Sequence, residues 1–205
     1  MSAPVRSSPL GLTVLALLHY KPSHPYGIQR LIKEWGKGRV VNVGQRAGLY
    51  RTIERLVAAG LIEILETGRD QQYPERTIYG ITDAGREAAR AWLLEMAGTP
   101  RQEFPAFPAA LSNLLLLAPE EVADVLERRA SALAASLAEL DAGLAAEAGR
   151  GLPRVTMLED EYLRAVTAAE LTWVRSVIED LRSGRLVWSL EQLAAFVEGG
   201  PSAAG

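Results

Sequence analysis

The stretch GQRAGLYRTIERLVAAGLIE, residues 44–63, decides the expected fold. At about 100° per residue of an α-helix, its large apolar side chains share one stripe. The stripe consists of Leu49, Ile53, Leu56 and Val57, and the opposite side consists of Ala47, Gly48, Arg51 and Arg55. Gly60 is a natural helix stop, and a β-rich run follows it. The stretch predicts a helix that is buried on one face and leads into a strand, and it leaves open whether the arginines contact DNA or only solvent.

Two helices are expected before this stretch. Ser8 and Pro9 suit the N-cap and the first position of a helix, whose apolar residues then point almost all round it. Such a helix must be buried on more than one side. A turn rich in histidine and proline separates it from a shorter helix that ends at Gly36.

A hairpin and a further helix are expected after the stretch. The β-rich runs LIEILETG and ERTIYGIT flank the polar segment RDQQYP, which places Arg69 and Arg76 near the tip of a β-hairpin. Thr82 and Asp83 open a helix that closes at Gly98. Three helices followed by a hairpin is the order of a winged helix-turn-helix domain. The three prolines of residues 99–108 mark the boundary, so we assign residues 1–98 to the winged domain and residues 99–205 to a second domain.

The second domain is predicted to be helical, which makes the fold class mainly α with a small β-hairpin. Between residues 119 and 149, apolar side chains recur every three or four positions in a coiled-coil-like seam, and another long helix is expected from about 158 to 182. Two long helices do not close a core alone. We therefore expect a second copy of the chain to cover them, with the apolar first helix, including Leu15, available to pack against it. Ser189 and Gln192 have capping-box spacing and predict a short final helix.

Charge is distributed unevenly between the two halves. Residues 1–97 contain 13 Lys and Arg against 9 Asp and Glu, a balance of +4, whereas residues 98–205 contain 9 against 16, a balance of −7. Five basic residues and one acid lie between Lys37 and Arg55, a local excess that suits DNA phosphates.

Several functions find no support in the composition. The chain has no cysteine, which excludes disulfides and thiolate chemistry and fits a reducing compartment, so we expect the cytoplasm. The N-terminal apolar run of about ten residues is too short to span a membrane. His19 and His24 flank a proline turn without ligand geometry, and three acids at 159–161 suit a helix start, so no metal or cofactor is expected. No phosphate loop or nucleophile–histidine–acid set is present, which argues against an enzyme.

Three segments resemble a known family. They are LGLTVLALLHYKPSHPYGIQRLI (10–32), GLYRTIERLVAAGLIE (48–63) and PERTIYGITDAGRE (74–87), followed by an Ala- and Leu-rich helical half. Over nearly its full length the chain resembles the PadR-like family of bacterial transcriptional regulators. The resemblance implies a winged helix-turn-helix homodimer, joined by C-terminal helices, that binds a palindromic operator, usually as a repressor. Members respond to phenolic acids or to flat hydrophobic compounds.

One position departs from the family pattern. Where members have Gly, then Ser or Thr, then an aliphatic residue and Tyr, this chain has Ala47, Gly48, Leu49 and Tyr50, so the hydroxyl expected at position 48 is missing. The resemblance makes Tyr50 a phosphate contact, and the helix suits a major groove in which arginine binds guanine bidentately. Arg46 is placed near the apolar side and reaches outward only from the first turn. The expected DNA-binding residues are Lys37, Arg39, Arg46, Gly48, Tyr50, Arg51, Arg55, Arg69 and Arg76.

The second domain offers a candidate interface. We expect Leu15, Tyr162, Val166, Ala169, Trp173 and Val177 to form an effector or dimer interface. Trp173 lies midway along its helix, where it either anchors the interface or, with its symmetry mate, forms a flat aromatic slot for a ligand. The prediction is thus a cytoplasmic, homodimeric regulator of double-stranded DNA that responds to a small aromatic or hydrophobic effector. The alternatives are a winged-helix scaffold protein without specific DNA binding and a small-molecule enzyme built on the helical half.

Overall fold

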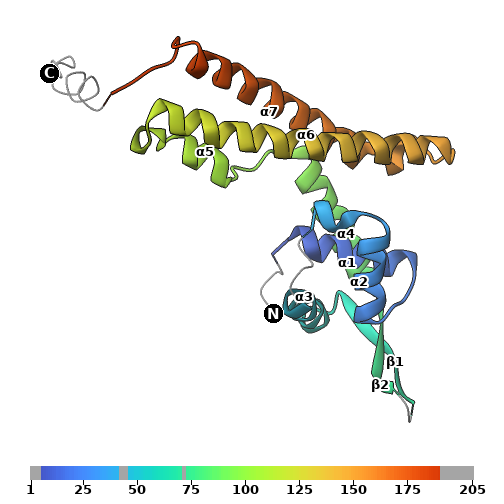
Figure 1. The fold of residues 1–205 in the computed structure, drawn as a ribbon. Coiled ribbons are helices and arrows are strands. Elements are labelled where there is room, and N and C mark those ends of the chain that lie inside the picture. The colour runs from blue at the N-terminus through green and yellow to red at the C-terminus, as the bar shows by residue number, and fades with distance from the viewer. Residues whose placement is uncertain (1–5, 42–45, 71–72, 190–205) are drawn as a thin grey trace, which may run out of the picture. The chain divides into compact units, whose positions relative to one another are not determined.

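The chain divides into two compact units, residues 1–102 and 103–205 (Figure 1). The computed structural model describes residues 6–41, 46–70 and 73–189, without the side chains of residues 46, 67–70 and 73–76. The first unit contains α1 (Pro9–Tyr20), α2 (Pro25–Glu34), the 3-10 turn η1 (Lys37–Arg39), α3 (Arg46–Ala58), β1 (Ile62–Asp70), β2 (Tyr73–Ile81) and α4 (Asp83–Gly98). The second contains α5 (Ala106–Leu111), η2 (Leu114–Leu116), α6 (Pro119–Gly149), η3 (Arg154–Thr156) and α7 (Leu158–Arg182).

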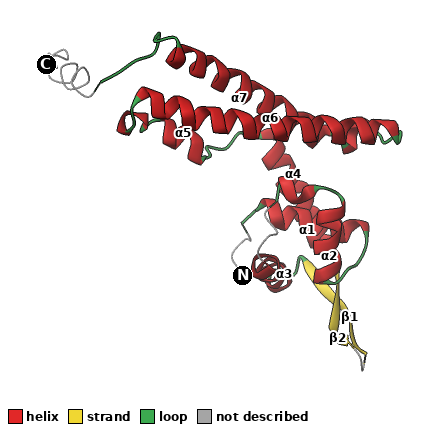
Figure 2. Ribbon diagram, viewed as in Figure 1, coloured by secondary structure: helices red, strands yellow, loops and turns green. Residues whose placement is uncertain are grey.

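The structure confirms the predicted fold class, which is mainly helical with one antiparallel hairpin (Figure 2). The expected helix boundaries also hold. The Ser8 hydroxyl accepts a hydrogen bond from the Gly11 amide at 3.1 Å and caps α1. Gly36 and Gly60, which follow α2 and α3, have φ of +67° and +69°, in the left-handed region that glycine adopts without a steric penalty.

Helix α1 lies at the centre of the first unit and contacts α2, α3, α4 and β2. Val14 and Leu15 are both 0% exposed, and the surrounding core includes Ile28, Ile53 and Trp92. The assignment of Leu15 to an effector or dimer interface is therefore wrong for this conformation. The all-round apolar pattern of α1 is satisfied inside its own unit, which leaves the Leu15 side chain no access to a partner.

The hairpin is longer than predicted. Strand β1 extends to Asp70 and strand β2 begins at Tyr73. Both strands therefore reach into the polar segment, whose composition predicts only a turn. The base of the hairpin is joined to the α1–α2 turn, because Ser23 and Tyr79 exchange backbone N–H···O bonds of 3.1 and 3.0 Å. This bridge fixes the hairpin relative to the helices before it.

In the second unit, α6 and α7 pack side by side (Figure 1). Their shared core contains Val122, Leu126, Val174 and Leu181. Part of the predicted linker is helical, since α5 begins at Ala106. Trp188 returns to the unit and donates its indole N–H to the Leu117 carbonyl at 3.1 Å. The short final helix predicted after Ser189 falls outside the described residues.

Neither a membrane-spanning helix nor a metal-binding cluster is present among the described residues. None of the helices in these residues combines the length and apolar character needed to cross a bilayer. The described side chains also contain no group of three or more His, Asp or Glu residues placed to hold a metal ion.

Candidate nucleic-acid interface

Helix α3 has the two faces that its sequence predicts. Leu49, Ile53 and Leu56 are no more than 2% exposed and pack into the core. Tyr50 and Arg51 are exposed on the outside. Within the part of the chain that the structure describes, Arg51 has no hydrogen bond or ion pair, so its five N–H donors remain available to an external acceptor. Arg46 is the first residue of α3, and its side chain is not among those that the structure describes.

The backbone at Gly48 is open to the outside. A Cβ built at this position meets no heavy atom within 4 Å, so packing does not require a glycine there. The Gly48 carbonyl accepts a hydrogen bond from the Thr52 hydroxyl, one turn later in α3, at 2.9 Å. A partner can therefore approach the main chain of α3 closely at this point.

Arg55 is exposed as predicted, but it has a partner inside the protein. Its Nη2 donates to the Ser8 hydroxyl at 3.0 Å, which joins the last turn of α3 to the N-cap of α1. One donor of the guanidinium is thus already used, in contrast to Arg51.

Tyr79 of β2 lies next to the outer side of α3. Burial raises the pKa of its hydroxyl above the ordinary value, and the nearby Glu54 and Tyr50 raise it further. Tyr79 therefore lies close enough to α3 for Glu54 and Tyr50 to act electrostatically on its hydroxyl. The phenol of Tyr79 stays protonated and neutral at physiological pH.

The remaining basic candidates lie on either side of α3. Lys37 and Arg39 are on η1, between α2 and α3, and both have polar contacts within the protein. Arg69 and Arg76 belong to β1 and β2, where the backbone of Arg76 pairs with that of Gly68. The side chains of both hairpin arginines lie outside the described residues, so their predicted phosphate contacts stay predictions.

The candidate stripe of the second unit is largely exposed. Tyr162, Val166 and Trp173 are 68%, 47% and 45% exposed, whereas Val177 is half-buried in the α6–α7 core. Ala169 is exposed between them. Trp173 also makes an edge-to-face contact with Phe107 of α5, with ring centroids 6.2 Å apart. The stripe therefore has one aromatic edge that is already packed.

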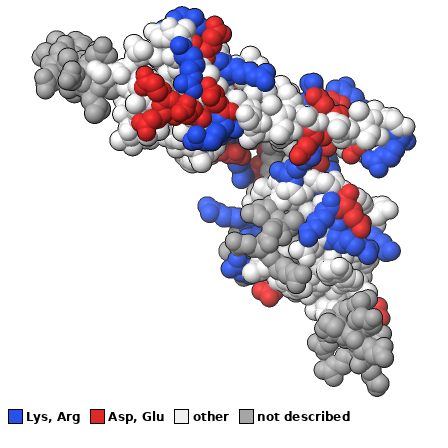
Figure 3. Space-filling model, in the orientation of Figure 1, with Lys and Arg blue, Asp and Glu red and all other residues white. Residues whose placement is uncertain are grey.

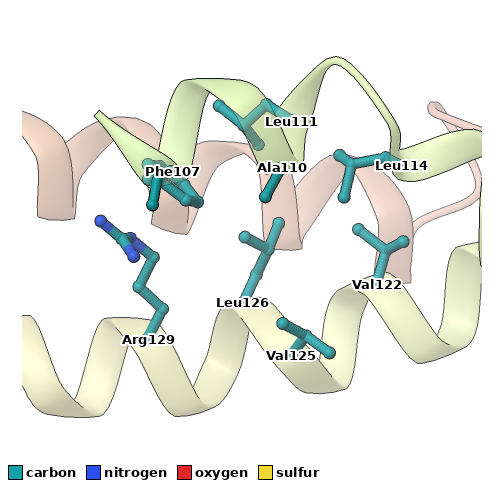
Figure 4. Close-up of a pocket in the computed structure, with 9 residues that line it drawn as sticks. Phe107, Ala110, Leu111, Leu114, Val122, Val125, Leu126 and Arg129 are labelled. Atoms are coloured by element: carbon teal, nitrogen blue, oxygen red, sulfur yellow. The ribbon is translucent and has the colours of Figure 1, made fainter. Parts of the chain in front are cut away.

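A pocket of about 280 Å³ lies between α5 and α6 (Figure 4). Its walls are almost entirely apolar, and Phe107 and Arg129 stand at one end. The Arg129 guanidinium lies 3.4 Å from the Phe107 ring centroid, and its Nε donates to Glu170 at 2.6 Å. Arg129 falls on the otherwise apolar seam of α6, and these two contacts explain how a cation is tolerated there. The lining residues are Ala106, Phe107, Ala110, Leu111, Leu114, Val122, Val125, Leu126 and Arg129.

Residues 14–91 match the Transcriptional regulator PadR-like family. This match lies within the N-terminal unit, and we refer to this unit as the PadR-like domain. The resemblance inferred from the sequence is thereby confirmed, and the chain is similar to transcriptional regulators of this family. No curated protein sequence matches it significantly.

Solved structures of PadR-like proteins share the fold over most of the chain. Bacillus subtilis PadR in complex with operator DNA has a TM-score of 0.70 at 18% identity, covering 87% of this chain and 99% of that one. The structure of the same protein in complex with p-coumaric acid has a TM-score of 0.67 at 18% identity, covering 85% of this chain and 99% of that one. The Bacillus cereus PadR-like regulator BC1756 has a TM-score of 0.60 at 21% identity, covering 88% of this chain and 99% of that one. At these identities the likeness establishes the fold.

The PadR-like domain contains one candidate that the sequence interpretation missed. Tyr26, in the first turn of α2, is 63% exposed, and its ring stacks on His24 with centroids 6.1 Å apart. His24 in turn caps α2, since its Nδ1 accepts the Gly27 amide at 2.9 Å. In a helix-turn-helix the first of the two helices crosses the DNA backbone, so a hydroxyl at the start of α2 is suited to a phosphate. In the sequence, Pro25 at the first helical position marks the start of α2 and could have placed Tyr26 in its first turn.

Proposed function

We propose that the protein is a DNA-binding transcriptional regulator that acts as a homodimeric repressor on a palindromic operator. The observation that supports this most strongly is α3, a helix with a buried apolar face and an outer face made of Gly48, Tyr50 and Arg51, within a PadR-like domain. An α-helix fits the major groove, where an arginine such as Arg51 can bind guanine bidentately. Tyr26, Tyr50, Lys37, Arg39 and the hairpin arginines would position the domain on the DNA backbone.

Dimerisation is inferred from apolar surface in the second unit. Tyr162, Val166 and Trp173 on α7, together with Leu116 of η2, stay between 45% and 84% exposed in the single chain. Exposed apolar patches of this kind commonly mark interaction sites. A homodimer formed through this surface would carry two copies of α3, one for each half-site of a palindromic operator, and such half-sites lie one helical turn of DNA, or a multiple of it, apart.

Ligand response is inferred from the pocket at Phe107. Its apolar walls and volume of about 280 Å³ suit a small aromatic or hydrophobic compound. Phe107 contacts Trp173, so a ligand that displaces the Phe107 ring would also alter the proposed dimer face. Release from the operator would follow if the change in that face separated the two copies of α3. p-Coumaric acid, which is bound in a Bacillus subtilis PadR structure, is the first probe to use.

The function is tested by DNA selection. The purified protein is incubated with fragments of its own genome, and the enriched fragment is used in gel shifts at two salt concentrations. We expect a specific complex that weakens steeply as salt rises, because several phosphate contacts release counterions. If no fragment is enriched, the regulator proposal fails. The alternative of a winged-helix scaffold protein, which the overall charge of −3 and the missing hydroxyl at Gly48 favour, would then hold.

The assembly and the ligand are tested separately. Sedimentation of the full chain should give a dimer, and the variant Trp173→Asp should shift it to a monomer. Arg175→Gln on the same helix changes the net charge by the same amount and is the control. A monomeric wild-type chain would contradict the dimer. p-Coumaric acid should raise the melting temperature and weaken the gel shift, and the variant Leu126→Phe, which fills the pocket, should remove both effects.

A further inference from the structure

Three helices of the PadR-like domain meet at the start of α1. The Ser8 hydroxyl accepts two hydrogen bonds there, one from the Gly11 amide at 3.1 Å and one from Arg55 Nη2 at 3.0 Å. A hydroxyl oxygen has two acceptor lone pairs, so Ser8 is fully used as an acceptor. It joins its own helix to the last turn of α3.

Close packing holds this junction in place. A Cβ at Gly11 would lie 2.9 Å from the Ser8 hydroxyl, 3.2 Å from the Trp92 ring of α4 and 3.7 Å from Arg55 Nη2. Even one added carbon would force the Ser8 hydroxyl to move. The exposed hydrogen bond between Arg55 and Ser8 therefore lies beside the close contact of Gly11 in α1 with Trp92 of α4.

Arg55 also lies at the end of α3 that is less suited to base contacts. In a helix-turn-helix, residues at the N-terminus of the second helix contact the base edges. Helix α3 begins at Arg46, and Arg55 follows nine residues later, about 14 Å along the axis at roughly 1.5 Å per residue. A cation in the last turn of a helix is in addition stabilised by the helix dipole.

We propose that Arg55 is a positioning residue of the DNA-binding surface and not a DNA contact. Through Ser8 it fixes the C-terminal end of α3 against α1, and it thereby sets the angle at which Tyr50 and Arg51 meet the DNA. This inference rests on the proposed function. It replaces the prediction that the Arg55 guanidinium binds a base or a phosphate.

A first test needs no DNA. Hydrogen exchange of the full-length protein is compared between the wild type and the variants Arg55→Ala, Ser8→Gly and Ser8→Thr. Glycine removes the hydroxyl but remains an acceptable N-cap, and threonine keeps the hydroxyl. Amides in the last turn of α3 should exchange faster in Arg55→Ala and Ser8→Gly, and at the wild-type rate in Ser8→Thr. Unchanged exchange in Ser8→Gly would show that the hydrogen bond does not hold α3 and would overturn the proposal.

A second test uses the duplex that the wild-type protein selects. Arg55→Ala and Ser8→Gly should each weaken binding by roughly tenfold, and the double variant should be no weaker than either single variant, because both remove the same link. The slope of log affinity against log salt should stay that of the wild type. In Arg51→Ala the slope should be shallower by about 0.9 if the Arg51 guanidinium also neutralises one phosphate.

The sequence specificity of DNA binding distinguishes a change in the orientation of α3 from a loss of folded protein. The ratio of affinity for the selected duplex to that for a scrambled duplex should fall in Arg55→Ala and Ser8→Gly at equal helicity, and Ser8→Thr should restore it. Wild-type binding by Ser8→Gly, together with a reduced salt slope in Arg55→Ala, would make Arg55 a phosphate contact and overturn the proposal. A wild-type protein that selects no duplex would instead refute the proposed function.

Discussion

Gly48 is the residue whose identity the fold explains least. It lies inside α3, it has ordinary helical φ, and a side chain at this position would meet nothing within 4 Å. Glycine in a helix interior is less stable than alanine because the unfolded chain gains more backbone freedom. Another residue at this position would therefore make the fold more stable. This suggests that the reason for a glycine lies in what the surface at Gly48 contacts.

Two substitutions at Gly48 separate stability from DNA contact. Gly48→Ala should raise the free energy of unfolding by about 0.5–1 kcal/mol, measured by urea denaturation. Gly48→Ser should raise it less, but it returns a hydroxyl to the outer face of α3 and should tighten binding to the selected duplex. If alanine tightens binding as much as serine does, the gain comes from helix stability and not from a hydroxyl contact. If both abolish binding, DNA approaches the main chain at Gly48 too closely for any Cβ.

Tyr79 gives the first unit a dependence on alkaline pH. Burial, Glu54 and Tyr50 all raise the pKa of its hydroxyl in the folded state. A group whose folded pKa is raised contributes stability that is complete below its unfolded pKa of about 10 and is lost as pH rises through the folded pKa. The free energy of unfolding should therefore decline above about pH 10. Tyr79→Phe should show a shallower decline in urea melts between about pH 9 and pH 11, and an identical decline would assign the effect to other groups.

At the scale of elements, sequence periodicity and capping predicted the helices well. Ser8, Gly36, Gly60 and Thr82 each occupy the cap or stop that their chemistry favours, because capping depends on residues close in sequence. Helix α5 was missed for a physical reason. Pro105 and Pro108 suggested a linker, yet they fall at the N-cap and in the first turn of α5, where backbone N–H groups have no helical partner and proline is tolerated.

The site was predictable only in part. Helical periodicity separated the buried and exposed faces of α3 correctly, because that pattern is local. The hydrogen bond between Arg55 and Ser8 joins residues 47 apart in sequence, and the pocket joins α5 to α6, so neither has a local signature. Leu15 was misplaced for the same reason, since an apolar residue gives no sign of whether its own chain or a partner covers it.

The core between α6 and α7 is thin, which makes single side chains important. Leu126 is 1% exposed and lies at the centre of the cluster with Val122 and Val174. Leu126→Ala should lower the free energy of unfolding by about 2–5 kcal/mol, because it removes buried methyl groups and leaves a cavity. Val125→Ala, next to it but 41% exposed, should cost much less. Urea denaturation measures both, and equal losses would place Val125 in a buried interface.

In the whole molecule, the surface of the second unit carries both ion pairs and an exposed apolar stripe. Arg182 binds Asp124 and Glu127 at 2.6 and 2.8 Å and links α7 to α6. Arg185 binds Glu179 and Asp180 just after α7 ends. Figure 3 shows such acidic and basic groups interspersed over this unit. These pairs balance only part of the unit's negative charge, and exposed ion pairs of this kind contribute little to stability. The exposed apolar stripe on α7 is the surface that a partner would cover.

The division of labour between the units is tested by a fragment of residues 1–102. This unit has its own core around Val14 and Leu15, so the fragment should fold, with a cooperative urea transition. It lacks the stripe of Tyr162, Val166 and Trp173 and should sediment as a monomer at all concentrations. Its affinity for the selected duplex should be far below that of the full chain, because two linked half-site contacts bind much more tightly than one. A folded fragment that dimerises would place the interface in the first unit, whereas a monomer with full affinity would show that one copy of α3 suffices.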